Sequence, residues 1–263
     1  MTVSAADKAE RLQALHAGPR AFVIANAFDA GSAKLLERLG FDALATSSGA
    51  AAGVLGRKDG ELSRDEALAH ARAIAAATEL PVSADLENGF GDSPEAVAET
   101  IRLAGATGVV GASIEDHTGD ASAPLYPIEF AAARITAAVH AARALPFAGF
   151  AITARAENFF RGPHDLADTI ARLRAYEAAG ADVLFAPALP DLDAVRAVCA
   201  ALTKPVNFMV GMKGKSWDLA TLEAVGVRRV SLATSLWRAA MAGVRAAAEE
   251  VRVHGTFGYV DRL

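Results

Sequence analysis

Eight short apolar runs alternate with longer amphipathic runs along the whole 263-residue chain. The apolar runs are almost continuously hydrophobic, which is typical of parallel strands whose two faces are both covered. In the longer runs, apolar residues recur every three or four positions, and several of these runs begin with a Ser or Asp cap, as helices do. The predicted strands span residues 21–28, 43–48, 81–87, 109–116, 149–157, 181–188, 205–211 and 228–234.

Eight strand–helix units in a chain of this length favour a (β/α)8 TIM barrel over an open, doubly wound sheet. No linker or low-complexity segment interrupts the pattern, so we expect a single barrel domain over residues 1–263. The C-terminal run 235–255 is longer than one barrel helix needs. It is interpreted either as an ordinary eighth helix or as a helix that packs on a neighbouring subunit.

Charge and cysteine content narrow the class of protein further. The net charge is −5 and the arginines are scattered along the helical runs, so nothing resembles the basic stripe of a nucleic-acid-binding protein. A single cysteine, Cys199, excludes an intrachain disulfide and favours a reducing cytoplasm. No uninterrupted apolar run is long enough to cross a bilayer, and the polar N-terminal run lacks the apolar core of a signal peptide.

Polar residues gather at or just beyond the ends of five predicted strands. In a barrel of this kind, active sites lie at the carboxyl ends of the strands, so this distribution indicates an enzyme. The residues concerned are Ser48, Asp85, Glu87, Glu115, His117, Arg155, Glu157 and Asn207.

Asp85, Glu87 and Glu115 would repel one another at one rim unless a cation held them together. Oxygen ligands suit Mg²⁺ or Mn²⁺. The alternative is that these acids cap a helix or pair with arginines. Arg155 likewise has two interpretations: it is a structural ion-pair partner, or it recognises a small carboxylate substrate in bidentate fashion.

The segments DLENGFG (85–91), SSGAAAGVLGRKDG (47–60), SIEDH (113–117) and TARAEN (153–158) together resemble the isocitrate lyase/phosphoenolpyruvate mutase superfamily. The superfamily motif is D-x-D-x-G-[YF]-G, and here a Glu replaces the second Asp. The resemblance implies a TIM barrel with a C-terminal helix exchanged between subunits of a dimer or tetramer. It also implies a Mg²⁺ site and a small 2-oxo acid or dicarboxylate as substrate.

Transferred position by position, the resemblance implies a role for each candidate residue. Asp85 is expected to bind the metal directly, and Glu87 and Glu115 to hold it through water. The backbone amides of Ser48, Gly49 and Ala50 are expected to receive the substrate's oxygens, and Arg155 its carboxylate. Asp59 is expected to contact substrate and metal waters from a mobile loop. The complete prediction is catalytic Asp59, Arg155 and His117; substrate-binding Ser48, Gly49, Ala50 and Asn207; and metal-binding Asp85, Glu87 and Glu115.

The reaction depends on the segment between Asp116 and Pro127. Isocitrate and methylisocitrate lyases carry a catalytic cysteine there and the phosphonate-handling members a Lys and an Asn, but this chain has none of these. Cys199 lies in a predicted helix and is interpreted as a buried structural thiol. We therefore expect C–C bond cleavage through a metal-stabilised enolate, as in an oxaloacetate decarboxylase or an aldol-type lyase, with His117 as a candidate proton donor. The alternatives are a phosphonomutase or phosphonopyruvate hydrolase, and a barrel that binds dicarboxylates without catalysis.

Overall fold

The computed structural model describes residues 3–262 and contains a closed barrel of eight parallel strands in chain order. All eight predicted strands are present, and the predicted TIM barrel is confirmed. The strands are β1 (Phe22–Asn26), β2 (Ala43–Ala45), β3 (Val82–Asp85), β4 (Gly111–Glu115), β5 (Ala151–Arg155), β6 (Val183–Phe185), β7 (Val206–Met209) and β8 (Arg229–Ser231).

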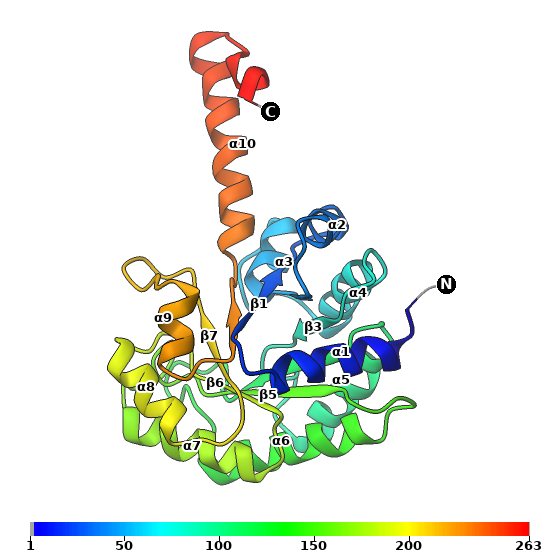
Figure 1. Cartoon of the computed structure of the whole chain (residues 1–263), viewed down its shortest axis with the longest axis vertical. Coiled ribbons are helices and arrows are strands. Elements are labelled where there is room, and N and C mark those ends of the chain that lie inside the picture. Colours follow the sequence, from blue (N-terminus) through cyan, green and yellow to red (C-terminus); the bar gives the residue numbers. More distant parts are fainter. Residues whose placement is uncertain (1–2, 263) are drawn as a thin grey trace.

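Each strand is shorter than its apolar run, because the run continues into the connection beyond the last ladder hydrogen bond. Helices surround the barrel (Figure 1). They are α1 (Ala5–Ala17), α2 (Ala30–Arg38), α3 (Ser48–Val54), α4 (Arg64–Ala75), α5 (Pro94–Gly105), α6 (Ile128–Arg143), α7 (Leu166–Ala178), α8 (Leu192–Ala200), α9 (Leu219–Ala224) and α10 (Ser235–His254), followed by the 3₁₀ turn η1 (Gly258–Arg262).

Local sequence signals explain where the helices begin. Ser63 caps α4 and forms a reciprocal capping box with Glu66, and Ser93 caps α5 with Pro94 in the first turn. Apolar residues of the helices, such as Ile74 and Ile101, are fully buried against the strands. The core therefore lies between the strands and the helical layer, and the carboxyl ends of all eight strands meet at one rim.

Helix α10 extends away from the barrel as a long projection (Figure 1). None of its described residues is buried, and Met241, Val244 and Val253 are largely exposed. The predicted exchange of this helix between subunits stays a prediction. Within residues 3–262, no helix combines the length and the apolar character that crossing a bilayer demands.

Candidate active site

A cavity of about 420 Å³ opens at the carboxyl ends of the strands. Six of the predicted site residues line it, and five of them lie on helices or strands: Ser48 and Gly49 at the start of α3, Asp85 at the end of β3, Arg155 at the end of β5, and Asn207 on β7. Asp59 lines it from the loop between α3 and α4. The barrel thus brings together residues that lie more than a hundred positions apart in the chain.

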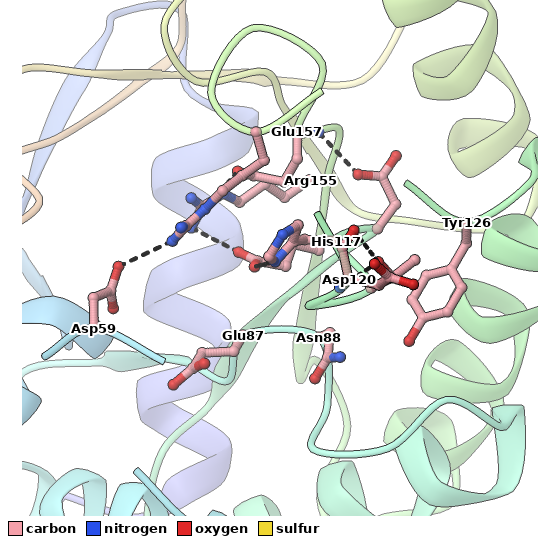
Figure 2. Close-up of polar contacts among 12 residues, drawn as sticks. Asp59, Glu87, Asn88, His117, Asp120, Tyr126, Arg155 and Glu157 are labelled. Atoms are coloured by element: carbon pink, nitrogen blue, oxygen red, sulfur yellow. Dashed lines mark hydrogen bonds and ion pairs between the residues drawn. The ribbon is translucent and has the colours of Figure 1, made fainter. Parts of the chain in front are cut away.

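Arg155 is the electrostatic centre of this site. Its Nη1 lies 3.2 Å from Glu115 Oε2 and 4.0 Å from Asp85 Oδ1, and its Nε donates to Glu157. Burial disfavours the charged guanidinium, but the carboxylates of Glu157, Glu115 and Asp85 outweigh that effect and raise the pKa of Arg155. Figure 2 shows Arg155 and Glu157 side by side. The single guanidinium therefore balances several buried acids.

Asp85 is held in place by three hydrogen bonds, to the segment 46–48 that follows β2 and to β4. Its backbone amide donates to Thr46 Oγ1 at 2.8 Å, and its carboxylate accepts from the Ser48 amide at 3.0 Å and the Ser113 hydroxyl at 3.3 Å. The side chain is only 16% exposed. A carboxylate oriented in this way is prepared to bind a cation without reorganisation.

The amides predicted to receive substrate oxygens are mostly engaged within the protein. The Ser48 amide donates to Asp85, and the Ala50 amide donates to Ser47 Oγ at 3.4 Å, because Ser47 is the N-cap of α3. Among residues 3–262, the Gly49 amide has no such acceptor. A Cβ at Gly49 would lie 2.9 Å from Thr234 Cγ2, so a larger residue at this packed position would force the Thr234 side chain to move.

Glu87 occupies a strained and poorly solvated position. Its φ is 50°, a left-handed conformation that non-glycine residues rarely adopt, and Phe90 in the same loop has φ 59°. Glu87 Oε1 is buried without a hydrogen-bond partner. Burial, together with the charges of Asp85 and Asp59, raises the pKa of Glu87 to about 7. In Figure 2 the side chain points away from Asn88, toward the side where Asp59 lies.

Asp59 and His117 stand at the edge of the cluster. Asp59 Oδ2 lies 3.2 Å from Arg161 Nη2, which ties the α3–α4 loop to the segment that follows β5. His117 Nδ1 lies 3.8 Å from Glu115 Oε1. Burial and the charge of Arg161 lower the pKa of His117 below its ordinary value, so the imidazole is neutral at neutral pH.

Three residues that sequence reasoning did not single out support the site. Arg161 lies between Asp59 and Glu157, at 4.0 Å from Glu157 Oε2. Arg134 of α6 is 1% exposed and donates to the backbone carbonyls of the 88–92 loop and of Glu115. Tyr176 donates to Asp116 at 2.5 Å, and Asp116 in turn accepts from the Glu157 amide. Nothing in the local sequence distinguishes these from other residues on amphipathic helices or loops.

The donor set fits a divalent cation bound partly through water. Within the described chain, no three acidic, His or Cys side chains converge into a ready-made cage. Asp85 is nevertheless preorganised, the neighbouring Glu87 has an orphaned buried oxygen, and burial raises the pKa of Glu115 well above its ordinary value despite the nearby Arg155. Mg²⁺ accepts one or two direct carboxylates and keeps several waters, which matches such an open arrangement.

Comparisons with known proteins identify the family of this chain. The family model described as phosphoenolpyruvate phosphomutase matches residues 12–252. A solved structure from Burkholderia cenocepacia J2315, provisionally described as a lyase/mutase, is 51% identical, with a TM-score of 0.95 over 98% of this chain and 92% of that one.

Two further matches are more distant. The oxaloacetate decarboxylase of Chromohalobacter salexigens is 31% identical over 87% of this chain and 80% of its own length. A structure of phosphonopyruvate hydrolase with oxalate and Mg²⁺ is 26% identical, with a TM-score of 0.88 over 97% of this chain and 90% of that one. On the family match and these likenesses, the chain belongs to the phosphoenolpyruvate phosphomutase family, within the isocitrate lyase/phosphoenolpyruvate mutase superfamily.

Proposed function

We propose that this protein is a Mg²⁺-dependent carbon–carbon lyase, for which Mn²⁺ can substitute, acting on a small 2-oxo acid or dicarboxylate through an enolate. The observation that carries the proposal is the cluster of Asp85, Glu115 and Arg155 at three adjacent strand ends. The family includes a decarboxylase of this substrate class, and a relative's structure holds Mg²⁺ and oxalate together.

Each residue has a defined task in this proposal. Asp85 would bind the cation directly, and Glu87 and Glu115 would hold it through water. When bound, the cation supplies positive charge that stabilises the enolate oxygen. Arg155 would receive the substrate's carboxylate as a bidentate partner. In the protein described here its guanidinium is occupied by Glu115 and Glu157, so substrate must share it or displace one of them.

His117 and Asp59 complete the site. His117, beside Glu115, would take up a proton from solvent and, as the imidazolium, donate it to the enolate carbon after the bond breaks, which returns the imidazole to its neutral form. Asp59 would contact the substrate when its loop lies over the cavity. The ion pair between Asp59 and Arg161 stabilises that position of the loop.

The segment 117–126 argues against phosphoryl chemistry as the main activity. It folds back on itself through a short antiparallel bridge between His117 and Leu125 and contains neither Lys nor Arg. A Lys or Arg in this segment would help to neutralise a transferred phosphoryl group, and the segment supplies neither. Phosphorus NMR of phosphonopyruvate incubated with the protein and Mg²⁺ tests this reasoning, because conversion of the phosphonate would contradict it.

The decisive experiment is a pyruvate-release assay with Mg²⁺ on oxaloacetate and on substituted malates. We expect release from at least one of them, lost on addition of EDTA and in Asp85→Asn. Asp193→Asn is the matched control, since that carboxylate lies on the exposed surface of α8. No release from any of these substrates, with equal metal-dependent binding of substrate and product, would instead favour a non-catalytic dicarboxylate-binding barrel.

We also propose a cytoplasmic homo-oligomer, a dimer or tetramer, in which the exposed apolar residues of α10 are covered by another subunit. Light scattering coupled to size-exclusion chromatography would give a single monomeric mass if this part of the proposal were wrong.

A further inference from the structure

The interior of this barrel is hollow below the site. In most TIM barrels, bulky branched side chains fill the inside in layers. Here small residues take inward positions on four strands, and the same cavity that contains Asp85 and Arg155 continues down between them. These residues are Ala45, Ser83, Ser113 and Ser231. A ligand bound at the rim therefore has room to extend toward the barrel floor.

Arg229 forms part of the lower wall of that cavity. It begins β8 and lies in register with Asn207 on β7 and Phe22 on β1. The residue is only 5% exposed, and its Nε donates to Asn207 Oδ1 at 2.8 Å. The amide nitrogen of Asn207 donates to Ser231 Oγ at 3.0 Å. Asn207 thus fixes the plane of the guanidinium.

Arg229 differs from Arg155, the other arginine of the barrel interior that lines this cavity, in having no counter-ion. Arg155 faces the carboxylates of Asp85, Glu115 and Glu157. In the described part of the chain, no carboxylate lies within 4.0 Å of Arg229, and its guanidinium donates to the neutral Asn207. A buried charge without a partner is costly, so its presence beside a cavity points to an anion supplied from outside.

The surroundings of Arg229 contribute no hidden negative charge. Burial alone lowers the pKa of Arg229, to about 9, which leaves the guanidinium protonated at neutral pH. Burial and the charge of Arg229 lower the pKa of His16 to about 3, so this neighbouring imidazole is neutral. The lower wall of the cavity is therefore positively charged under ordinary conditions.

We infer that Arg229, oriented by Asn207, is a specificity-determining residue that receives the distal carboxylate of the substrate. This inference rests on the proposed function, in which the other end of the substrate binds Arg155 and the cation. It assigns the substrate class as dicarboxylates rather than monocarboxylates. The guanidinium of Arg229 would stabilise the negative charge of the distal carboxylate, and decarboxylation removes that charge. Arg229 would therefore favour reactions in which the distal carboxylate is kept.

The test compares two ligands that differ in the distal carboxylate. Oxalate occupies only the rim end, whereas 3,3-difluorooxaloacetate adds a carboxylate beyond C3. Their dissociation constants are measured by calorimetry with Mg²⁺ for the wild-type protein and for Arg229→Gln. We expect the difluoro diacid to bind roughly 10- to 100-fold more weakly to the variant, the range of a lost charged hydrogen bond, with oxalate changed less than about twofold.

A second variant keeps the test decisive if Arg229→Gln folds poorly, and a third serves as the control. Asn207→Asp places a carboxylate beside Arg229, which should stabilise the buried charge and still remove its affinity for the diacid. Arg228→Gln is the matched control, because it removes the same charge one position earlier, on a side chain that lines a different cavity at the opposite end of the barrel.

The outcomes separate the inference from the proposed function. A selective loss of diacid affinity in both Arg229→Gln and Asn207→Asp supports the inference. Unchanged diacid affinity in Asn207→Asp, or an equal loss for oxalate and diacid, overturns it and leaves the proposed function intact. Failure of the wild-type protein to bind oxalate with Mg²⁺ would instead overturn the proposed function, and the inference with it.

Discussion

Glu87 offers a prediction that can be made without any substrate. In the metal-free protein its pKa is about 7, compared with 4.5 for an ordinary glutamate. The folded state therefore binds a proton more tightly than the unfolded state does. The resulting stabilisation is fully present below about pH 4.5 and is lost as the pH rises through about 7. In EDTA, the free energy of unfolding should fall over this interval.

The size of the effect follows from the two pKa values. At about 1.4 kcal/mol for each tenfold change in proton affinity, the rise corresponds to roughly 3 kcal/mol, or about 2 kcal/mol if residual solvent access weakens it. In a chain of this size that amounts to roughly 5–10 °C in melting temperature. Glu87→Gln, which cannot ionise, should lack this loss and should melt higher than the wild type at pH 8.

The assay is thermal unfolding followed by circular dichroism at pH 5 and pH 8 in EDTA. Glu10→Gln, on the exposed face of α1, serves as the control. Adding Mg²⁺ at pH 8 should stabilise the wild type more than Glu87→Gln, because the cation favours the ionised carboxylate. Parallel pH profiles for the wild type and Glu87→Gln would refute the reasoning, since the buried oxygen would then have no influence on proton binding.

Three other predictions concern the residues around the cation site. Asp85→Asn should abolish Mg²⁺-dependent activity while Glu87→Asp retains it, and the reverse order in steady-state assays would contradict the assigned roles. Arg134→Met should leave loop carbonyls without donors and lower the free energy of unfolding, measured by urea denaturation, by about 3 kcal/mol or more. It should also weaken Mg²⁺ binding measured by calorimetry. Unchanged Mg²⁺ affinity would show that Arg134 contributes only to stability. Tyr176→Phe should cost about 1–3 kcal/mol by removing a donor to the buried Asp116, and an unchanged denaturation midpoint would show that this bond contributes nothing.

The architecture and the rim of the site could be predicted from the sequence because both depend on local pattern. Apolar runs marked the strands, and the parallel barrel places the residues that follow them at one edge, so Asp85, Glu115 and Arg155 were expected to meet. Their position near each other is a consequence of strand register, which the closed barrel leaves little freedom to change.

Contacts that depend on side-chain reach across the fold could not be predicted. Arg161 contacts Asp59 across 102 residues, and no periodicity links the two loops. Arg134 occupies a helix position that resembles any other arginine on an amphipathic helix. For Arg228 and Arg229, adjacent at the start of β8, sequence alone does not show which one enters the barrel, because a shift of one residue in register exchanges the two faces.

The pairing of β1 with β8 has a consequence for the synthesis of this protein. Asn26, at the end of β1, accepts hydrogen bonds from the amide of Leu232, 206 residues later. At a translation rate of about 5–20 residues per second, β8 is synthesised on the order of ten to forty seconds after β1. During that time the apolar edge of β1 is unpaired and can associate with other chains. Arg229, which lies in register with Phe22, belongs to the strand that finally pairs with this edge. The last strand to leave the ribosome thus both completes the barrel and brings the unpaired cation to its lower wall.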